Sequence, residues 1–128
     1  MESITKPLVL VGEDDSAQRD ILTEVLEVEG YRVLTAQDAP SLLRHLQQGP
    51  DAVLLDIVGV SNRDVIAAIS GLPWPPAVLL LSGDARLPEL ARSMNADAFL
   101  AKPYELDVLL GTLASSLDFR QKRKRVPL

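Results

Sequence analysis

Three short stretches of this chain are apolar at every position, and they limit the folds that it can adopt. They cover residues 8–11, 52–55 and 77–81. A strand that is continuously apolar is typical of a sheet covered on both faces. Residues 31–35 and 98–101 have the short, β-rich or apolar composition of further strands, so we predict five strands in all.

The segments between these strands carry apolar residues at helical spacing. Residues 17–28 form the first such segment, and Gly30 follows it where a helix end favours a left-handed residue. Asp38 can cap a second helix, and Asn95 lies where a fourth would end. The later helices are predicted at 38–48, 64–70, 88–94 and 105–119.

Strands that alternate with helices at such short intervals predict an α/β fold, a doubly wound parallel sheet with helices on both faces. Open sheets of this class bind ligands at the carboxyl ends of their strands, near the point where the strand order reverses. The residues that follow each predicted strand are therefore the first candidates for a functional site.

Composition and charge exclude several classes of protein. The 128 residues are 47% hydrophobic and 24% charged, as in one globular domain, and without cysteine the chain has no disulfides or thiolate metal ligands. We find no signal-peptide pattern at the N-terminus and no apolar run of membrane-spanning length, so we predict a soluble, cytoplasmic protein without membrane contact.

The charge is unevenly distributed along the chain. Five basic residues between 120 and 125 contribute +5 to a net charge of −5, so the rest of the chain carries −10. An acidic body does not attract nucleic acid. We therefore divide the chain into a domain at 1–119 and a basic, solvated tail or linker at 120–128.

Charged and hydroxyl residues follow four of the predicted strands. They are Glu13 and Asp14 after the first strand, Asp56 after the third, Ser82 after the fourth and Lys102 after the fifth. Carboxylates without histidine or cysteine suit Mg²⁺ rather than zinc. A carboxylate beside such an ion can act as a nucleophile toward phosphorus, while a lysine and a hydroxyl bind the phosphoryl oxygens.

Four strings carry a family resemblance. "LVLVGEDDSAQRDIL", "AVLLDI", "LLLSG" and "AFLAKPYEL" resemble, in this order, the response-regulator receiver domain of bacterial two-component signalling. The resemblance covers about residues 6–119 and implies the flavodoxin-like receiver fold, with five helices and strand order 2-1-3-4-5. It also implies a phosphoryl group taken from a histidine kinase or a histidine phosphotransfer protein.

The resemblance assigns a role to each candidate residue. Asp56 matches the phosphoacceptor, and Glu13 and Asp14 match the acids that position Mg²⁺, which leaves Asp15 as an extra acid. Ser82 matches the switch hydroxyl and Lys102 the phosphate-binding lysine.

Two further positions complete the assignment. Pro103 matches the proline whose bond to Lys102 is cis, and Phe99 the aromatic that moves with the hydroxyl. Such a domain catalyses its own phosphorylation and dephosphorylation, and is not a turnover enzyme on an external substrate.

The resemblance also implies partners. Phosphorylation would change a face formed by the fourth helix, fifth strand and fifth helix. That face would bind a downstream output protein, an output domain elsewhere in a longer chain, or a second copy in a homodimer.

The loop after Asp56 departs from the family pattern. It reads Ile57-Val58-Gly59-Val60-Ser61-Asn62, without the usual proline and Asp-Gly. Val58 inherits the position whose backbone carbonyl ligates the metal. Its β-branched side chain is expected to hinder the water that hydrolyses the acyl phosphate.

Two other functions stay open from the sequence alone. The altered loop is compatible with a receiver-like interaction module that is not phosphorylated. A flavin-binding domain of similar shape is disfavoured because three adjacent acids would repel phosphate. Outside the site, we interpret His45 as solvated and Trp74 as a loop-packing residue.

Overall fold

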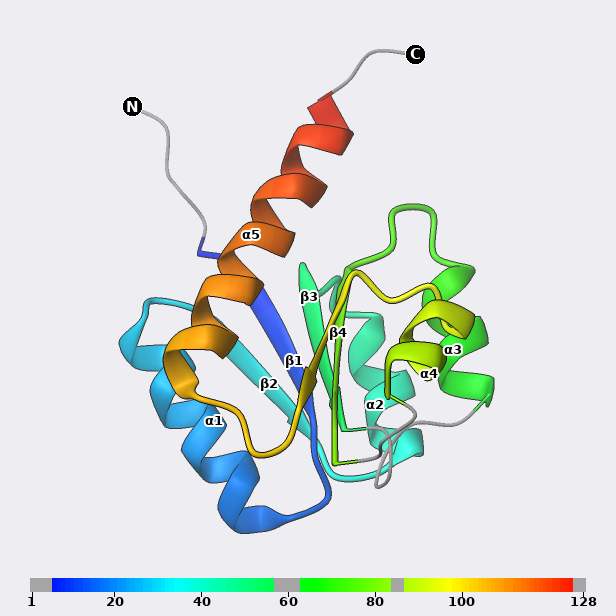
Figure 1. Ribbon diagram of the computed structural model, residues 1–128. Coiled ribbons are helices and arrows are strands. Elements are labelled where there is room, and N and C mark those ends of the chain that lie inside the picture. Colours follow the sequence, from blue (N-terminus) through cyan, green and yellow to red (C-terminus); the bar gives the residue numbers. More distant parts are fainter. Residues whose placement is uncertain (1–5, 57–62, 84–86, 126–128) are drawn as a thin grey trace.

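In the computed structural model, the described residues 6–56, 63–83 and 87–125 form five strands and five helices that alternate along the chain (Figure 1). The strands are β1 Leu8–Gly12, β2 Arg32–Ala36, β3 Ala52–Asp56, β4 Ala77–Ser82 and β5 Ala98–Ala101. The helices are α1 Ser16–Val28, α2 Ala39–Leu46, α3 Arg63–Ser70, α4 Leu87–Ser93 and α5 Leu106–Arg125. The predicted elements are all present, with ends within one or two residues except for α5.

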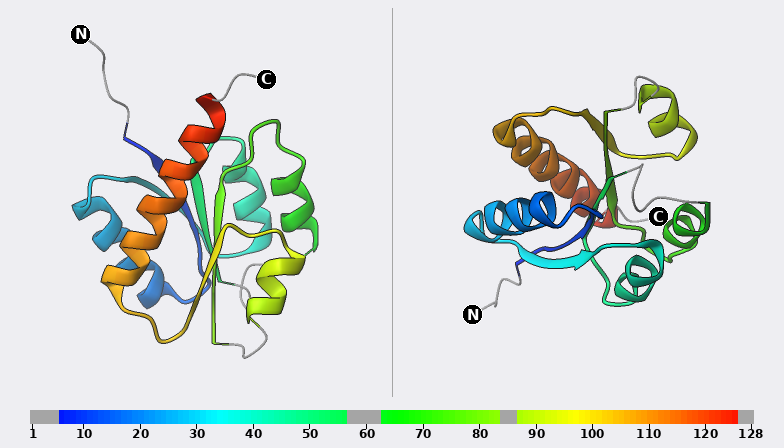
Figure 2. Two further views of the ribbon diagram at one scale, coloured as in Figure 1. Left: turned by 45° about the horizontal axis from the view of Figure 1, so that its top comes forward. Right: turned by 90° about the horizontal axis from the view of Figure 1, so that it is seen from below.

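The strands form one parallel sheet in the order β2-β1-β3-β4-β5. Figure 2 shows α1 and α5 on one face of this sheet and α2, α3 and α4 on the other. Because successive strand residues point to opposite faces, each central strand contributes to both cores. On β1, Val9 and Val11 pack with the core beneath α1 and α5, while Leu10 packs with the core beneath the other helices.

Local sequence signals account for the helix ends. The Asp38 carboxylate accepts a hydrogen bond from the Ser41 backbone N–H and so begins α2 with a capping box. Gly30 and Asn95 adopt positive φ after α1 and α4, as their positions predict. None of the helices in the described ranges is long and apolar enough to cross a bilayer.

The prediction that the last helix ends near Phe119 is wrong. Helix α5 continues to Arg125, so the predicted boundary between domain and tail falls inside a helix. Arg120 is 8% exposed. Its guanidinium lies 3.5 Å from the centroid of the Trp74 ring, in agreement with a packing role for Trp74. At least this first residue of the predicted tail therefore belongs to the folded unit.

The prediction that His45 is solvated is also wrong. The side chain is half-buried, and its Nδ1 is enclosed without a hydrogen-bond partner among the described residues. Helix α2 packs against α3 as well as the sheet, so less of its surface meets solvent than the sequence pattern suggests.

Candidate functional site

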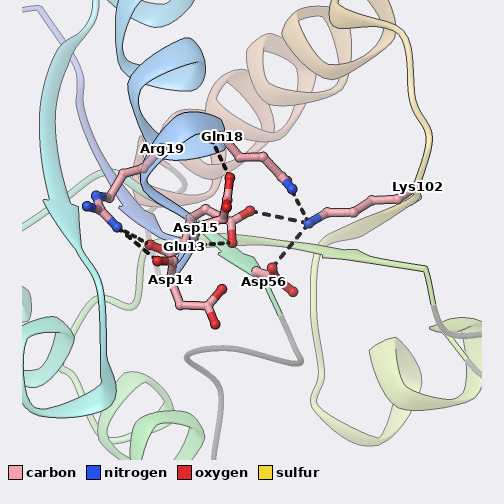
Figure 3. A network of polar contacts seen from close by, with 7 residues as sticks. All are labelled: Glu13, Asp14, Asp15, Gln18, Arg19, Asp56 and Lys102. Atoms are coloured by element: carbon pink, nitrogen blue, oxygen red, sulfur yellow. Dashed lines mark hydrogen bonds and ion pairs between the residues drawn. The ribbon is translucent and has the colours of Figure 1, made fainter.

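The carboxyl ends of the strands bring the predicted charged residues together. Gly12 is level with Leu55 in the β1–β3 ladder, so the next residue on each side, Glu13 and Asp56, lies at the same edge of the sheet. Lys102 follows β5 and donates its backbone N–H to the Ser82 carbonyl at the end of β4. The parallel register therefore places residues from four strand ends in one cluster, part of which is drawn in Figure 3.

Three carboxylates form the centre of this cluster. Glu13, Asp14 and Asp56 each offer one oxygen, and these oxygens lie within 4.8 Å of one another. Glu13 and Asp56 are 1% and 7% exposed, whereas Asp14 is exposed to solvent. Burial, together with the hydrogen bond to Asp56 and its negative charge, raises the pKa of Glu13 to about 7.

Lys102 is the cation of the cluster. Its ammonium lies 3.1 Å from Asp56 Oδ2 and 3.2 Å from Glu13 Oε1. Burial alone would lower the pKa of Lys102, but the hydrogen bond to Asp56 and the charges of Asp56 and Glu13 outweigh it and raise the pKa. The lysine is thus held in its charged form.

Gln18 is a member of this cluster that the sequence interpretation missed. Its Oε1 accepts a third hydrogen bond from the Lys102 ammonium, at 3.1 Å. The only signal in the sequence is its place three residues after Asp15, the third position of a helix. That spacing predicts a cap and not a contact across the sheet.

Asp15, the extra acid, does not join the three carboxylates. It is the N-cap of α1, and its Oδ2 accepts from the Gln18 backbone N–H at 2.8 Å. Arg19 Nη1 donates to the carbonyl of Glu13 at 2.9 Å and to that of Asp14 at 3.3 Å. The three adjacent acids are tolerated because each has a different environment, and because Arg19 fixes the backbone that carries two of them.

The other predicted site residues are placed less centrally. Ser82 is fully buried at the end of β4, and Phe99 on β5 is 44% exposed. The peptide bond between Lys102 and Pro103 is cis. Val58 and the rest of the loop 57–62 lie outside the described residues.

The residues present fit a hard divalent cation. The donor set is all carboxylate, and Lys102 is paired with two of the three acids, Glu13 and Asp56. Burial and the neighbouring charge of Asp56 raise the pKa of Glu13, and a bound cation would oppose both effects. An ion such as Mg²⁺, which prefers oxygen ligands, would supply that positive charge.

A doubly wound sheet with acids and a lysine at its carboxyl edge is the class of protein that these observations define. The Response regulator receiver domain family matches residues 9–114. The chain therefore belongs to the response-regulator receiver family, and the flavin-binding alternative is set aside.

Among curated relatives, the chain is similar to the Sensory/regulatory protein RpfC of Xanthomonas campestris, with 35% identity over 83% of this chain and 16% of RpfC. It is also similar to the Transcriptional regulatory protein PrrA of Mycobacterium tuberculosis, with 32% identity over 91% of this chain and 52% of PrrA. The chain spans about half or less of the length of these relatives, so their whole activities do not transfer to it.

Solved structures agree with this assignment. A CheY-like receiver domain protein from Methanospirillum hungatei superposes with a TM-score of 0.84 at 26% identity, over 93% of this chain and 99% of that one. NtrX from Brucella abortus matches with a TM-score of 0.79 at 29% identity, over 94% of this chain but 29% of that one. The same fold thus occurs both nearly alone and as one part of a longer protein.

Proposed function

We propose that this receiver domain accepts a phosphoryl group on Asp56 from a phosphohistidine of a sensor kinase or a phosphotransfer protein. One observation carries the proposal: Asp56, at the end of β3, is nearly buried and lies 3.1 Å from the Lys102 ammonium. The Lys102 ammonium favours the carboxylate form of Asp56, and burial leaves that carboxylate little hydration, as suits a nucleophile.

In the transfer step, an Oδ of Asp56 forms a bond to phosphorus while the phosphorus–nitrogen bond of the donor breaks. The electron pair of that bond returns to the imidazole nitrogen, and Asp56 becomes an acyl phosphate. Lys102 donates hydrogen bonds to the phosphoryl oxygens, and the Ser82 hydroxyl at the end of the adjacent strand β4 supplies another. Phe99 then moves toward the space that the hydroxyl leaves.

Glu13, Asp14 and Asp56 would hold Mg²⁺, together with the backbone carbonyl of Val58. When bound, the ion supplies positive charge that offsets the charge of the phosphoryl oxygens. The fit rests on the oxygen donor set, whose atoms lie within 4.8 Å of one another, and on the pairing of Lys102 with two of the three acids.

The added group carries nearly two negative charges, so it shifts the domain between two conformations. We expect the change to be read on the face formed by α4, β5 and α5, by an output protein, an output domain or a second copy of the chain. Such a relay operates in the cytoplasm, which stays our prediction for this chain.

Phosphorylation without a kinase tests the proposal. Incubation with phosphoramidate and Mg²⁺ should add about 80 Da to the protein, as one phosphoryl group does. Asp56→Asn should abolish the increase, while Asp20→Asn, at an exposed acid of α1, should leave it unchanged. No mass increase in the wild type, or an equal increase in Asp56→Asn, would overturn the proposal and leave the non-phosphorylated interaction module.

A further inference from the structure

The ammonium of Lys102 has three N–H groups, and the described residues provide three acceptors for them. Two are the carboxylates of Glu13 and Asp56, and the third is the side-chain amide oxygen of Gln18, at 3.1 Å (Figure 3). Gln18 lies 84 residues from Lys102 in the sequence and is the only neutral acceptor of the three. Helix α1 thus contacts the lysine of the phosphoryl site directly.

The start of α1 explains why the Gln18 side chain is available for this contact. Asp15 and Gln18 have the spacing of a capping box, in which the side chain of the third helical residue bonds back to the N–H of the N-cap. Here the carboxylate of Glu13 accepts from the Asp15 N–H instead, at 3.4 Å. The amide of Gln18 is therefore directed away from its own helix end and toward Lys102.

This third contact limits where the ammonium can point. A lysine side chain has four flexible bonds, and that of Lys102 is 24% exposed, so an unheld ammonium would turn toward water. With Gln18 holding one N–H, the remaining two face Glu13 and Asp56. The lysine is then already oriented toward the carboxylate of Asp56, the group that reacts.

We propose that Gln18 is a positioning residue that holds the Lys102 ammonium toward Asp56, before and during phosphoryl transfer. The inference rests on the proposed function, because it assigns to Gln18 a part in that same reaction. Gln18 acts through Lys102 and does not itself touch the transferred group.

The test compares three substitutions by their initial rate of phosphorylation with phosphoramidate. Gln18→Met has similar length and helix propensity but no acceptor oxygen of comparable strength, and losing one neutral hydrogen bond should slow the reaction roughly 3-fold. Gln18→Glu restores an oxygen at the same place and should bring the rate back to within about 2-fold of wild type. Gln48→Met, at an exposed position beyond the far end of α2, is the matched control and should have no effect.

A second comparison separates positioning from a general effect on the fold. If Gln18 acts through Lys102, adding Gln18→Met to Lys102→Met should not slow the reaction further. In the free protein, the ¹H–¹⁵N signal of the Lys102 ammonium should be sharp in the wild type and broadened in Gln18→Met by faster exchange with water.

The outcomes distinguish this inference from the proposed function. A wild-type protein that is phosphorylated at the same rate as Gln18→Met overturns the role of Gln18 alone. The role of Gln18 is also overturned if Gln18→Glu reacts as slowly as Gln18→Met. It is overturned as well if the Lys102 ammonium signal is the same in Gln18→Met and the wild type. A wild-type protein that takes up no phosphoryl group overturns the proposed function, and the role of Gln18 with it.

Discussion

Glu13 is the residue at which the demands of folding and of the site conflict most. It is 1% exposed, and among the described residues its paired cation, Lys102, is shared with Asp56. Its pKa of about 7 therefore lies well above the ordinary value of 4.5. The fold keeps Glu13 protonated under conditions in which an unfolded chain would release the proton.

This shift predicts that the protein loses stability as the pH rises. Below pH 4.5 both states bind the proton, so the contribution of Glu13 to stability is fully present there. Between pH 4.5 and about 7 only the folded state keeps the proton, and the free energy of unfolding falls until the folded pKa is passed. We expect the free energy of unfolding of the wild type to fall by roughly 2 kcal/mol between pH 5 and 8 because of Glu13. The glutamine of Glu13→Gln cannot ionise, so that variant should not show this fall.

Urea unfolding of both proteins at pH 5 and pH 8, with EDTA to remove divalent ions, measures the difference. Other carboxyl groups titrate in both proteins and cancel in the comparison. Parallel pH dependences for wild type and Glu13→Gln would show that Glu13 is ionised in the folded protein at pH 5, contrary to its burial.

At the scale of elements, Arg120 anchors the C-terminal half of α5 through several polar contacts. Arg120 Nε donates to the Pro75 carbonyl at 2.8 Å, and Nη2 donates to that of Trp74 at 3.3 Å. Nη1 forms an ion pair with Asp51 at 3.1 Å, and the other oxygen of Asp51 accepts from the Leu8 N–H. A single side chain thus joins α5 to the loop before β4 and to the beginnings of β1 and β3.

Removing this guanidinium should destabilise the fold. Arg120→Met keeps the apolar stem but leaves Asp51 and two backbone carbonyls without their donor, at an expected cost of roughly 2–4 kcal/mol. Lys122→Met is the matched control, because the pair of Lys122 with Asp118 is exposed on both sides and should change stability by less than about 0.5 kcal/mol.

Urea denaturation midpoints at pH 7 provide the measurement for both variants. Equal midpoints for Arg120→Met and the wild type would mean that α5 does not depend on this anchor. A shortened chain that ends at Phe119 should be at least as unstable as Arg120→Met, since it also lacks the last turns of α5.

At the scale of the whole molecule, the sequence predicts the sheet well because each strand signals itself locally. The apolar runs 8–11, 52–55 and 77–81 are strands, as expected of a sheet that is covered on both faces and so buries every position of its central strands. The meeting of Glu13, Asp14, Asp56 and Lys102 follows from the same argument, since parallel strands end at one edge.

The roles of Gln18 and Arg120 could not be predicted, because they depend on contacts between residues far apart in the sequence. Gln18 meets a lysine 84 residues away, and its spacing from Asp15 indicates a helix cap instead. In the sequence, Arg120 looks like the start of a solvated basic run. The carbonyls that accept its hydrogen bonds belong to a loop 45 and 46 residues earlier, so no neighbouring residue reveals the contact. Local sequence predicts elements, whereas these two residues are defined by how the elements pack.

The phosphoryl site and the Arg120 anchor lie at opposite ends of strand β3. Asp51, the partner of Arg120, precedes β3, and Asp56 ends it, so the two sites are separated by about 16 Å of extended strand. Sites this far apart that share no partner change stability independently. The change in the free energy of unfolding for the double variant Glu13→Gln/Arg120→Met should therefore equal the sum of the single changes to within about 0.5 kcal/mol.

Urea unfolding at pH 8 measures all four proteins of this cycle. A coupling above roughly 1 kcal/mol would show that changes at one end of β3 are felt at the other, contrary to this expectation.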